Sequence, residues 1–71
     1  MMQQINDLLR AVPFLPFKIR ASNGREYPVP STGHAIVSPT LGSVSVYDDE
    51  GLVHIISALH VASVEGPAAL A

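Results

Sequence analysis

The sequence predicts a single small, mainly β domain over residues 1–71, in which one N-terminal helix precedes about five strands of a strongly bent antiparallel barrel. Apolar residues recur every three or four positions near the start of the chain, and every second position from residue 17 onwards. Turn signals separate the alternating segments. Strand and helix patterns do not alternate, which excludes a parallel nucleotide-binding sheet, and the small number of strands favours a barrel over a sandwich.

The length and composition limit the domain to one thin hydrophobic core. A chain of 71 residues should bury only about 60% of the surface that it exposes when unfolded. Domains of this size usually need disulfides, a metal or a partner subunit, and no Cys is present to form a disulfide or a Cys-based zinc site. Only 14% of the residues are charged, against roughly 25% in typical soluble domains. Part of the surface is therefore expected to be covered. Self-association is the favoured source of the additional stability that the thin core requires.

The first expected element is an amphipathic helix over about residues 3–12. Its apolar residues lie three or four positions apart, as on one face of a helix: Ile5, Leu8, Leu9 and Val12. Pro13 should end the helix, because proline disfavours a helical conformation of the preceding residue and cannot donate the next hydrogen bond. A helix this short is marginal alone, so it is expected to pack on the rest of the domain.

Strands over about residues 17–22 and 25–30 are expected to form the first hairpin. Three residues of the first strand alternate with polar ones and should face the core: Phe17, Ile19 and Ala21. Asn23-Gly24 tolerates positive φ at both central positions of a type I′ turn, so the chain should reverse there. Pro28 and Pro30 lack amide donors, so the second strand should be short, bent or at a sheet edge.

A second hairpin is expected over about residues 43–48 and 52–57. The alternation places its core-facing and outward residues as follows: Val44 and Val46 inward, Tyr47 outward. The three carboxylates of Asp48–Glu50 are consecutive and precede a glycine. Because a calcium loop staggers its oxygen ligands at alternate positions, this run indicates a solvated hairpin turn rather than a calcium or acid-catalysis site.

The remaining segments are expected to be a loop, a last strand and a tail. Residues 31–42 carry several turn-forming residues and should form a structured loop with a brief extended piece at Ala35–Val37. A tight turn at Ser57–Leu59 would let a fifth strand run over about residues 60–65. Residues 66–71 are then expected to be a frayed tail.

Three histidines are the side chains best suited to acid–base chemistry near neutral pH or to metal binding: His34, His54 and His60. His54 and His60 are six positions apart, too far along one strand to share a metal at bonds of about 2 Å. The expected turn between them could bring them together, but two histidines without Cys or carboxylate are an incomplete ligand set. We therefore expect no metal site and no cofactor.

No arrangement of a nucleophile and a base stands out. The chain has no Cys, no Gly-x-Ser-x-Gly motif and no glycine-rich phosphate motif, and its serines from Ser38 onwards have no neighbouring base. We expect that the protein is not an enzyme and has no catalytic residues.

Lys18, Arg20 and Arg25 are the best case for a nucleic-acid-binding face. Lys18 and Arg20 share one side of the first strand, Arg25 follows the turn, and Tyr27 or His34 could stack a base. The alternative is that Lys18 and Arg20 are the solvent side of a half-buried strand. Four Lys and Arg against six Asp and Glu give a net charge of -2, so the positive surplus of nucleic-acid-binding proteins is absent and RNA is not favoured.

Membrane insertion and export are also not expected. No apolar run approaches the ~20 residues of a membrane span. The first seven residues lack the cationic region of a secretory signal. Cytoplasmic residence is the expectation.

Several segments together resemble a group of short bacterial proteins of unknown function. These proteins carry a Pro-Phe-x-Pro-Phe segment and an Asn-Gly-Arg or Asp-Gly-Arg hairpin, which correspond here to Pro13–Phe17 and Asn23–Arg25. The likeness extends through the Val46-Tyr47 strand to Ile55–Val64 and covers nearly the whole chain. The resemblance implies a stiff joint between helix and strand, with Phe14 and Phe17 available to anchor it in the core.

The order of elements is also similar to the Sm-like fold of the LSm and Hfq proteins, a small barrel related in shape to SH3-like barrels. That similarity implies a ring in which the fourth strand of one subunit pairs with the fifth strand of the next, and a history of RNA binding. The Asp-x-aromatic-x-Asn signature of Sm proteins should fall near Ser31–Val37, where this chain has Ser-Thr-Gly-His-Ala-Ile-Val.

The leading functional hypothesis is a non-enzymatic β-barrel module that assembles into a homo-oligomer, with a ring as one form, through pairing of edge strands. The alternatives are an Sm-like RNA-binding ring and an adaptor that binds an unrelated protein by strand addition. The expected oligomer interface consists of Leu52, His54, Ile56, Val61 and Ser63. The residues expected to bind nucleic acid in the RNA alternative are Lys18, Arg20, Arg25, His34 and His60.

Overall fold

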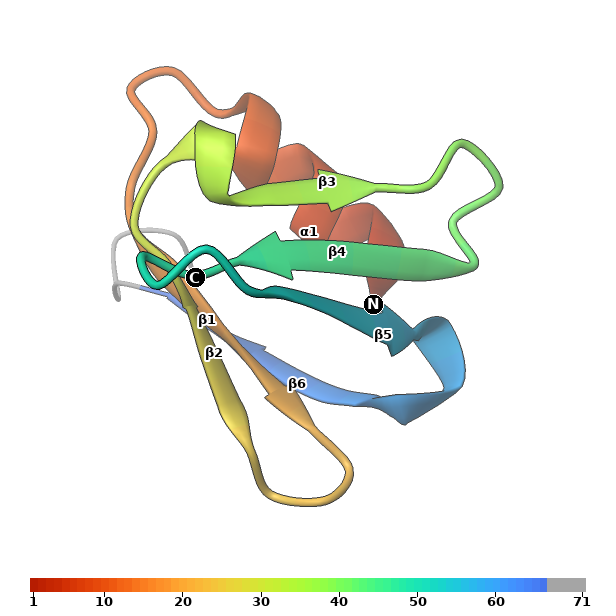
Figure 1. Ribbon diagram of the computed structural model, residues 1–71. Coiled ribbons are helices and arrows are strands. Elements are labelled where there is room, and N and C mark those ends of the chain that lie inside the picture. The colour runs from red at the N-terminus through yellow and green to blue at the C-terminus, as the bar shows by residue number, and fades with distance from the viewer. Residues whose placement is uncertain (67–71) are drawn as a thin grey trace.

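Residues 1–66 of the computed structural model form one helix and six strands, arranged in two three-stranded antiparallel sheets (Figure 1). The strand order is β2-β1-β6 in the first sheet and β3-β4-β5 in the second. The elements are α1 (Met2–Arg10), β1 (Phe17–Ala21), β2 (Glu26–Val29), β3 (Ala35–Val37), β4 (Ser43–Tyr47), β5 (Val53–Ser57) and β6 (Val61–Glu65). Two short 3-10 turns connect the sheets, η1 (Thr32–His34) and η2 (Ala58–His60). The fold is therefore mainly β with one N-terminal helix, as the sequence predicts.

The two sheets do not join into one closed barrel, so the predicted five-stranded barrel is not confirmed. The second strand was expected to reach residue 30 but ends at Val29, and Pro30 and η1 then lead the chain away from β1. The η1 turn then carries the chain to the second sheet, where Ala35–Val37 pairs with β4. The brief extended piece expected inside the loop is thus the strand β3, one more than the five strands predicted.

One hydrophobic core lies between the two sheets and the helix. The largest fully buried side chains come from all three layers: Ile5, Ile19, Val29, Val44 and Val46. The three predicted inward positions of β1 are at most 6% exposed, and Tyr47 faces outward. The period-two prediction is confirmed for β1 and β4.

The helix ends at Arg10, two residues earlier than predicted, and Val12 is not part of its packed face. Ala11 has extended backbone angles (φ −62°, ψ 142°), and Val12 is 96% exposed. Pro13 accounts for this, because it disfavours a helical conformation of Val12. The residues that do pack from the helix are Met2, Ile5, Leu8 and Leu9.

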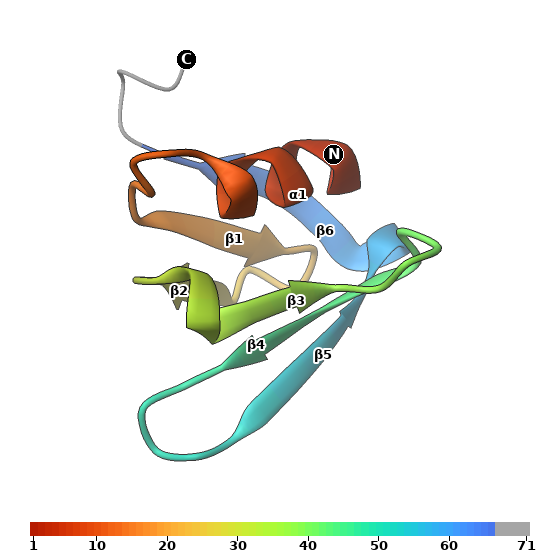
Figure 2. The same cartoon turned by 90° about the horizontal axis from the view of Figure 1, so that it is seen from above.

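The helix covers only one side of the molecule. It contacts β3 and β6. Figure 2 shows α1 and β5 on opposite sides of the structure. The last strand of the second sheet is therefore left on the side away from the helix.

The two hairpin loops share one design, which differs from the predicted type I′ turn. In the first loop Gly24 has a positive φ (88°), whereas Asn23 does not. The Gly24 amide donates to the Ala21 carbonyl and the Ala21 amide donates to the Arg25 carbonyl, each at 2.9 Å. Three loop residues rather than two therefore join the strands, as in a type I turn followed by a left-handed glycine. Gly51 (φ 86°) has the corresponding place in the second loop.

Truncation of Ile5 should test how the helix is attached. We expect Ile5→Ala to lower the free energy of unfolding by about 2–5 kcal/mol, because it removes a fully buried side chain. Ile5→Val, which removes one methylene, should cost about 0.5–1.5 kcal/mol and keeps the effect measurable if the larger truncation unfolds the domain. Val12→Ala is the matched control on an exposed site and should change stability by no more than about 0.5 kcal/mol in urea unfolding. A comparable loss in Val12→Ala would contradict the attachment through Ile5.

Candidate functional site

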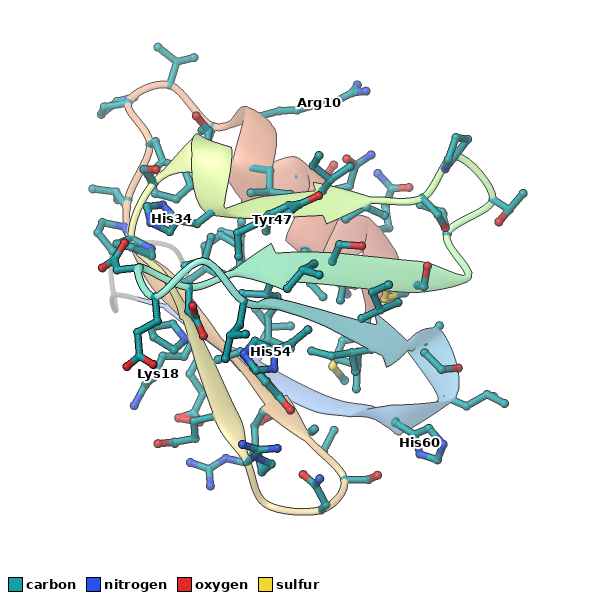
Figure 3. The ribbon with its side chains drawn as sticks, viewed as in Figure 1. Arg10, Lys18, His34, Tyr47, His54 and His60 are labelled. Atoms are coloured by element: carbon teal, nitrogen blue, oxygen red, sulfur yellow. The ribbon has the colours of Figure 1, made fainter. Side chains whose placement is uncertain are left out.

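A cleft of about 230 Å³ lies between β2 and the loop that joins β4 to β5, and we call it the histidine cleft. Its polar and aromatic lining consists of Arg25, Glu26, Tyr27, His34, Tyr47, Asp48, Asp49 and His54. His34 comes from η1 and His54 from β5, so the cleft brings together segments that are distant in the sequence (Figure 3). The rings of Tyr27 and His54 are 5.2 Å apart at an interplanar angle of 50°, which closes one wall of the cleft.

Asp48 organises the loop beside the cleft. One carboxylate oxygen, Oδ1, accepts hydrogen bonds from the amides of Glu50 (2.9 Å) and Leu52 (3.0 Å). The other oxygen, Oδ2, lies 3.1 Å from Nε2 of His54, which must be the donor because an ionised carboxylate only accepts. The hydrogen bond from His54, followed by that from Leu52, lowers the pKa of Asp48. The carboxylate thus stabilises the loop conformation and connects the loop to β5.

A second hydrogen-bonded chain links Ser31, His34 and Asp49. Nε2 of His34 lies 3.0 Å from Oδ1 of Asp49, and Nδ1 of His34 lies 2.7 Å from Oγ of Ser31. With the carboxylate as acceptor, a neutral His34 donates from Nε2 and accepts the Ser31 hydroxyl proton at Nδ1. These contacts were not predicted from the sequence, because His34 and Asp49 are 15 positions apart. The only local signal was the Ser-x-x-His spacing in the η1 turn.

This chain has the hydrogen-bond direction of a hydrolytic Ser-His-Asp triad, but not its surroundings. The Asp49 side chain is 89% exposed and is therefore well solvated. In hydrolases the acidic member is buried, orients the imidazole and stabilises its charged form. The Ser31–His34 contact spans three positions of a single turn and also serves to close that turn. The arrangement fixes η1 against the β4–β5 loop.

Lys18 and Arg20 are paired with carboxylates on the outer face of the first sheet. Arg20 Nη2 lies 2.5 Å from Glu26 and 3.1 Å from Glu65, and Lys18 Nζ lies 3.6 Å from Glu26. The hydrogen bond with Glu65, followed by attraction to Glu26 and Glu65, raises the pKa of Arg20. The two cations and two carboxylates leave this face with little net charge.

The other candidate nucleic-acid residues lie in different places. Arg25 and His34 line the histidine cleft. His60 lies on η2 and lines a separate cleft. Its Nδ1 is 3.2 Å from Oγ of Ser22. Figure 3 shows Lys18, His34 and His60 well apart. The structure therefore does not gather the five candidates on one surface.

The predicted oligomer residues also differ in their surroundings. Ile56 is buried in the core, and His54 is half-buried in the histidine cleft. Leu52 is 56% exposed at the end of the loop, and Val61 and Ser63 are half-buried on β6. The large outward side chains of β5 are those of Val53 and Ile55. Sequence reasoning did not single out these two, because apolar residues at 53, 55 and 56 fit either face of the strand.

Within residues 1–66, no group of three or more His, Cys, Asp or Glu side chains is placed to hold a metal ion. The same residues contain no helix long and apolar enough to cross a membrane. Comparisons of the chain with protein-family models, curated proteins and solved structures give no match.

The contact between Asp48 and His54 should make stability depend on pH. Since the pKa of Asp48 is lowered in the folded state, the stabilisation is complete above the ordinary aspartate pKa of about 3.9 and is lost as the pH falls through the lowered value. We expect Asp48→Asn, which keeps an acceptor oxygen for the loop amides, to be less stable than the parent at pH 7. The difference should shrink at pH 3 in urea unfolding at one protein concentration. Glu50→Gln on the same loop is the control, and an equal pH dependence in both variants would contradict this role.

Ser31 should not react as an activated nucleophile. The solvated Asp49 and the local turn contact give its hydroxyl little activation, so we expect no adduct when the intact protein is incubated with a fluorophosphonate probe and weighed by mass spectrometry. A stoichiometric adduct on Ser31 that disappears in His34→Ala would contradict this expectation and show that Ser31, His34 and Asp49 form a functional catalytic triad.

Proposed function

We propose that this protein is a non-enzymatic β module that assembles with copies of itself through edge strands β5 and β6. The observation that carries the proposal is the strand order. Over residues 1–66, β5 pairs only with β4, and β6 pairs only with β1. Each strand therefore presents one row of backbone groups without a partner strand, which favours pairing with another chain.

The other two sheet edges are better protected. The β2 edge contains Pro28, which has no amide hydrogen, and β3 is only three residues long. By contrast, β5 and β6 are each five residues long and contain no proline. Glu65, at the end of β6, is their single charged residue. Two protected and two unprotected edges support a specific pairing between β5 and β6.

The ladder register identifies which groups of β5 are free to pair. The Asp48 amide donates to the Leu52 carbonyl at 3.0 Å and the Ala58 amide to the Gly42 carbonyl at 2.9 Å, at either end of the β4–β5 ladder. Because bonded pairs alternate in an antiparallel ladder, the backbone groups of His54 and Ile56 point to β4. Those of Val53, Ile55 and Ser57 point away from it. An incoming strand would therefore bond to these three residues.

The free edge of β5 opens onto a cleft of about 360 Å³, which we call the edge cleft. Its walls are Ile55–Ser57 on one side and the β1–β2 hairpin with His60 on the other. The cleft gives an incoming strand room beside β5. Since β5 and β6 are different strands, a β5-to-β6 contact is heterologous and produces a ring if it closes and a filament if it does not.

The strand order also supports a relationship to the Sm-like barrel. Read across the molecule, β6-β1-β2 is followed by β3-β4-β5, with η1 as the joint between β2 and β3. We propose that this is a small bent barrel opened between β5 and β6, the same two strands through which the Sm-like resemblance implies subunit pairing. The RNA-binding form of this proposal has less support, because Lys18 and Arg20 already have carboxylate partners.

Ser57→Pro should weaken assembly. The amide of Ser57 points to the free edge, and its φ of −63° suits proline, so the change removes an edge donor with little strain. The loss of one hydrogen bond and the bulk of the ring should raise the dissociation constant about tenfold or more. Sedimentation velocity across a concentration series measures this constant.

Ser57→Ala is the matched control for that experiment. It removes the hydroxyl that accepts the Leu59 amide at 3.3 Å but keeps the edge amide. It should assemble as the parent does. If Ser57→Pro keeps the parent's mass at every concentration, or if the parent is a monomer, the edge-pairing proposal is wrong. A stoichiometric heteropartner recovered with a monomeric parent would favour the adaptor alternative instead.

A further inference from the structure

The outward face of the second sheet carries no charged residue, and four of its side chains are large. Its outward positions carry only apolar or uncharged residues: Ile36, Ser43, Ser45, Tyr47, Val53, Ile55 and Ser57. The exposed fractions of the large side chains are 59% for Ile36, 41% for Tyr47, 48% for Val53 and 71% for Ile55. We call this surface the outer face. An antiparallel sheet with one solvated face normally alternates apolar and polar residues; β4 follows that pattern, whereas Ile36 on β3 and Val53 and Ile55 on β5 depart from it.

The first sheet shows the contrast within the same molecule. Its outward residues include Lys18, Arg20, Glu26 and Glu65, which pair with one another. Charged side chains are thus present on one sheet and absent from the outward positions of the other. A low overall charge does not explain this distribution, but a covered outer face does.

We propose that the outer face packs against the outer face of a second copy of this chain, as an isologous two-fold contact distinct from edge pairing. This inference goes beyond the proposed function, since it concerns a different surface and does not require the edges to pair. In such a contact the same residues of both copies face each other, as in two sheets of a sandwich.

The area of the outer face suits a dimer contact. From their exposed fractions, the four large side chains present on the order of 400 Å² per copy, taking roughly 150–250 Å² for a fully exposed large side chain. Two copies would bury about twice that area from these side chains alone, and the three serines and the rim residue Leu52 extend it past the roughly 1,000 Å² expected of a biological interface. The contact therefore reaches the lower limit of area for a biological dimer.

The shape and charge of the face favour a second copy as the occupant. Ser45 lies between Ile36 and Ile55 in one cross-strand row, so a small side chain separates two large ones. An isoleucine of one copy can fill the gap above Ser45 of the other, which makes the row complementary to itself. Because the outward positions hold no charge, a second copy would bury no unpaired charge in the contact.

Ile36→Lys tests the face contact without changing β5 or β6, the two strands that we propose to pair. Ile36 lies on β3, two strands away from the free edge of β5. Burying a lysine in the contact should raise the dissociation constant of the two-fold contact by about 10- to 100-fold. Val12→Lys adds the same charge at a 96% exposed site outside the face and should leave assembly unchanged.

Native mass spectrometry and sedimentation velocity of the full chain distinguish the two contacts. The parent should contain an even number of subunits, Ile36→Lys should contain half that number, and Ser57→Pro should remain a dimer. The double variant should be a monomer with the circular dichroism of the parent. An unchanged mass for Ile36→Lys, or an odd number of subunits in the parent, would overturn the two-fold contact. If Ser57→Pro alone keeps the parent's mass, edge pairing fails while the face contact stands.

Discussion

The end of β2 before Pro30 and the η1 turn that follows are the constraint on which the rest of the structure depends. β2 stops at Val29, Pro30 fixes the backbone φ at about −65°, and after η1 the next strand joins a different sheet. Val29, which directly precedes this turn, belongs to the same buried cluster as Val44 and Val46 of the second sheet. The same turn carries His34 to the β4–β5 loop, where it meets Asp49. This turn thus joins the two sheets and supplies one side of the histidine cleft.

Much of the fold could be predicted, because the relevant signals are local. The alternation around Ile19 and Val44 specifies which face of each strand is buried, and that signal needs no tertiary information. The predictions failed where the outcome depends on the exact loop length or on distant partners. Asn23-Gly24 indicated a reversal correctly, but one additional loop residue changed the turn type. The strand at 35–37 is too short to be recognised without its partner β4.

The candidate site was less predictable than the fold. His54 and Asp48 are close in sequence, yet their contact depends on the three-residue loop that returns the chain beside them. His34 and Asp49 belong to different hairpins, so only the completed core brings them together. The apolar residues at 53, 55 and 56 posed a related difficulty, because the burial of Ile56 is decided by the register with Val44. Sequence patterns identify candidate chemistry here, but packing decides which side chains meet.

The distribution of charge connects the thin core to assembly. A small domain gains little stability from its own core, and this chain has no disulfide to add. Its paired charges cover the first sheet, and a further acidic cluster occupies the β4–β5 loop, whereas the outward positions of the second sheet remain uncharged. Contact with water then disfavours the apolar side chains of the outer face, the unpaired strand edges offer backbone groups to another chain, and the charged sheet keeps the assembled particle solvated. Association would therefore supply apolar burial that 71 residues cannot provide alone, and it would do so on the side of the molecule that the helix leaves open.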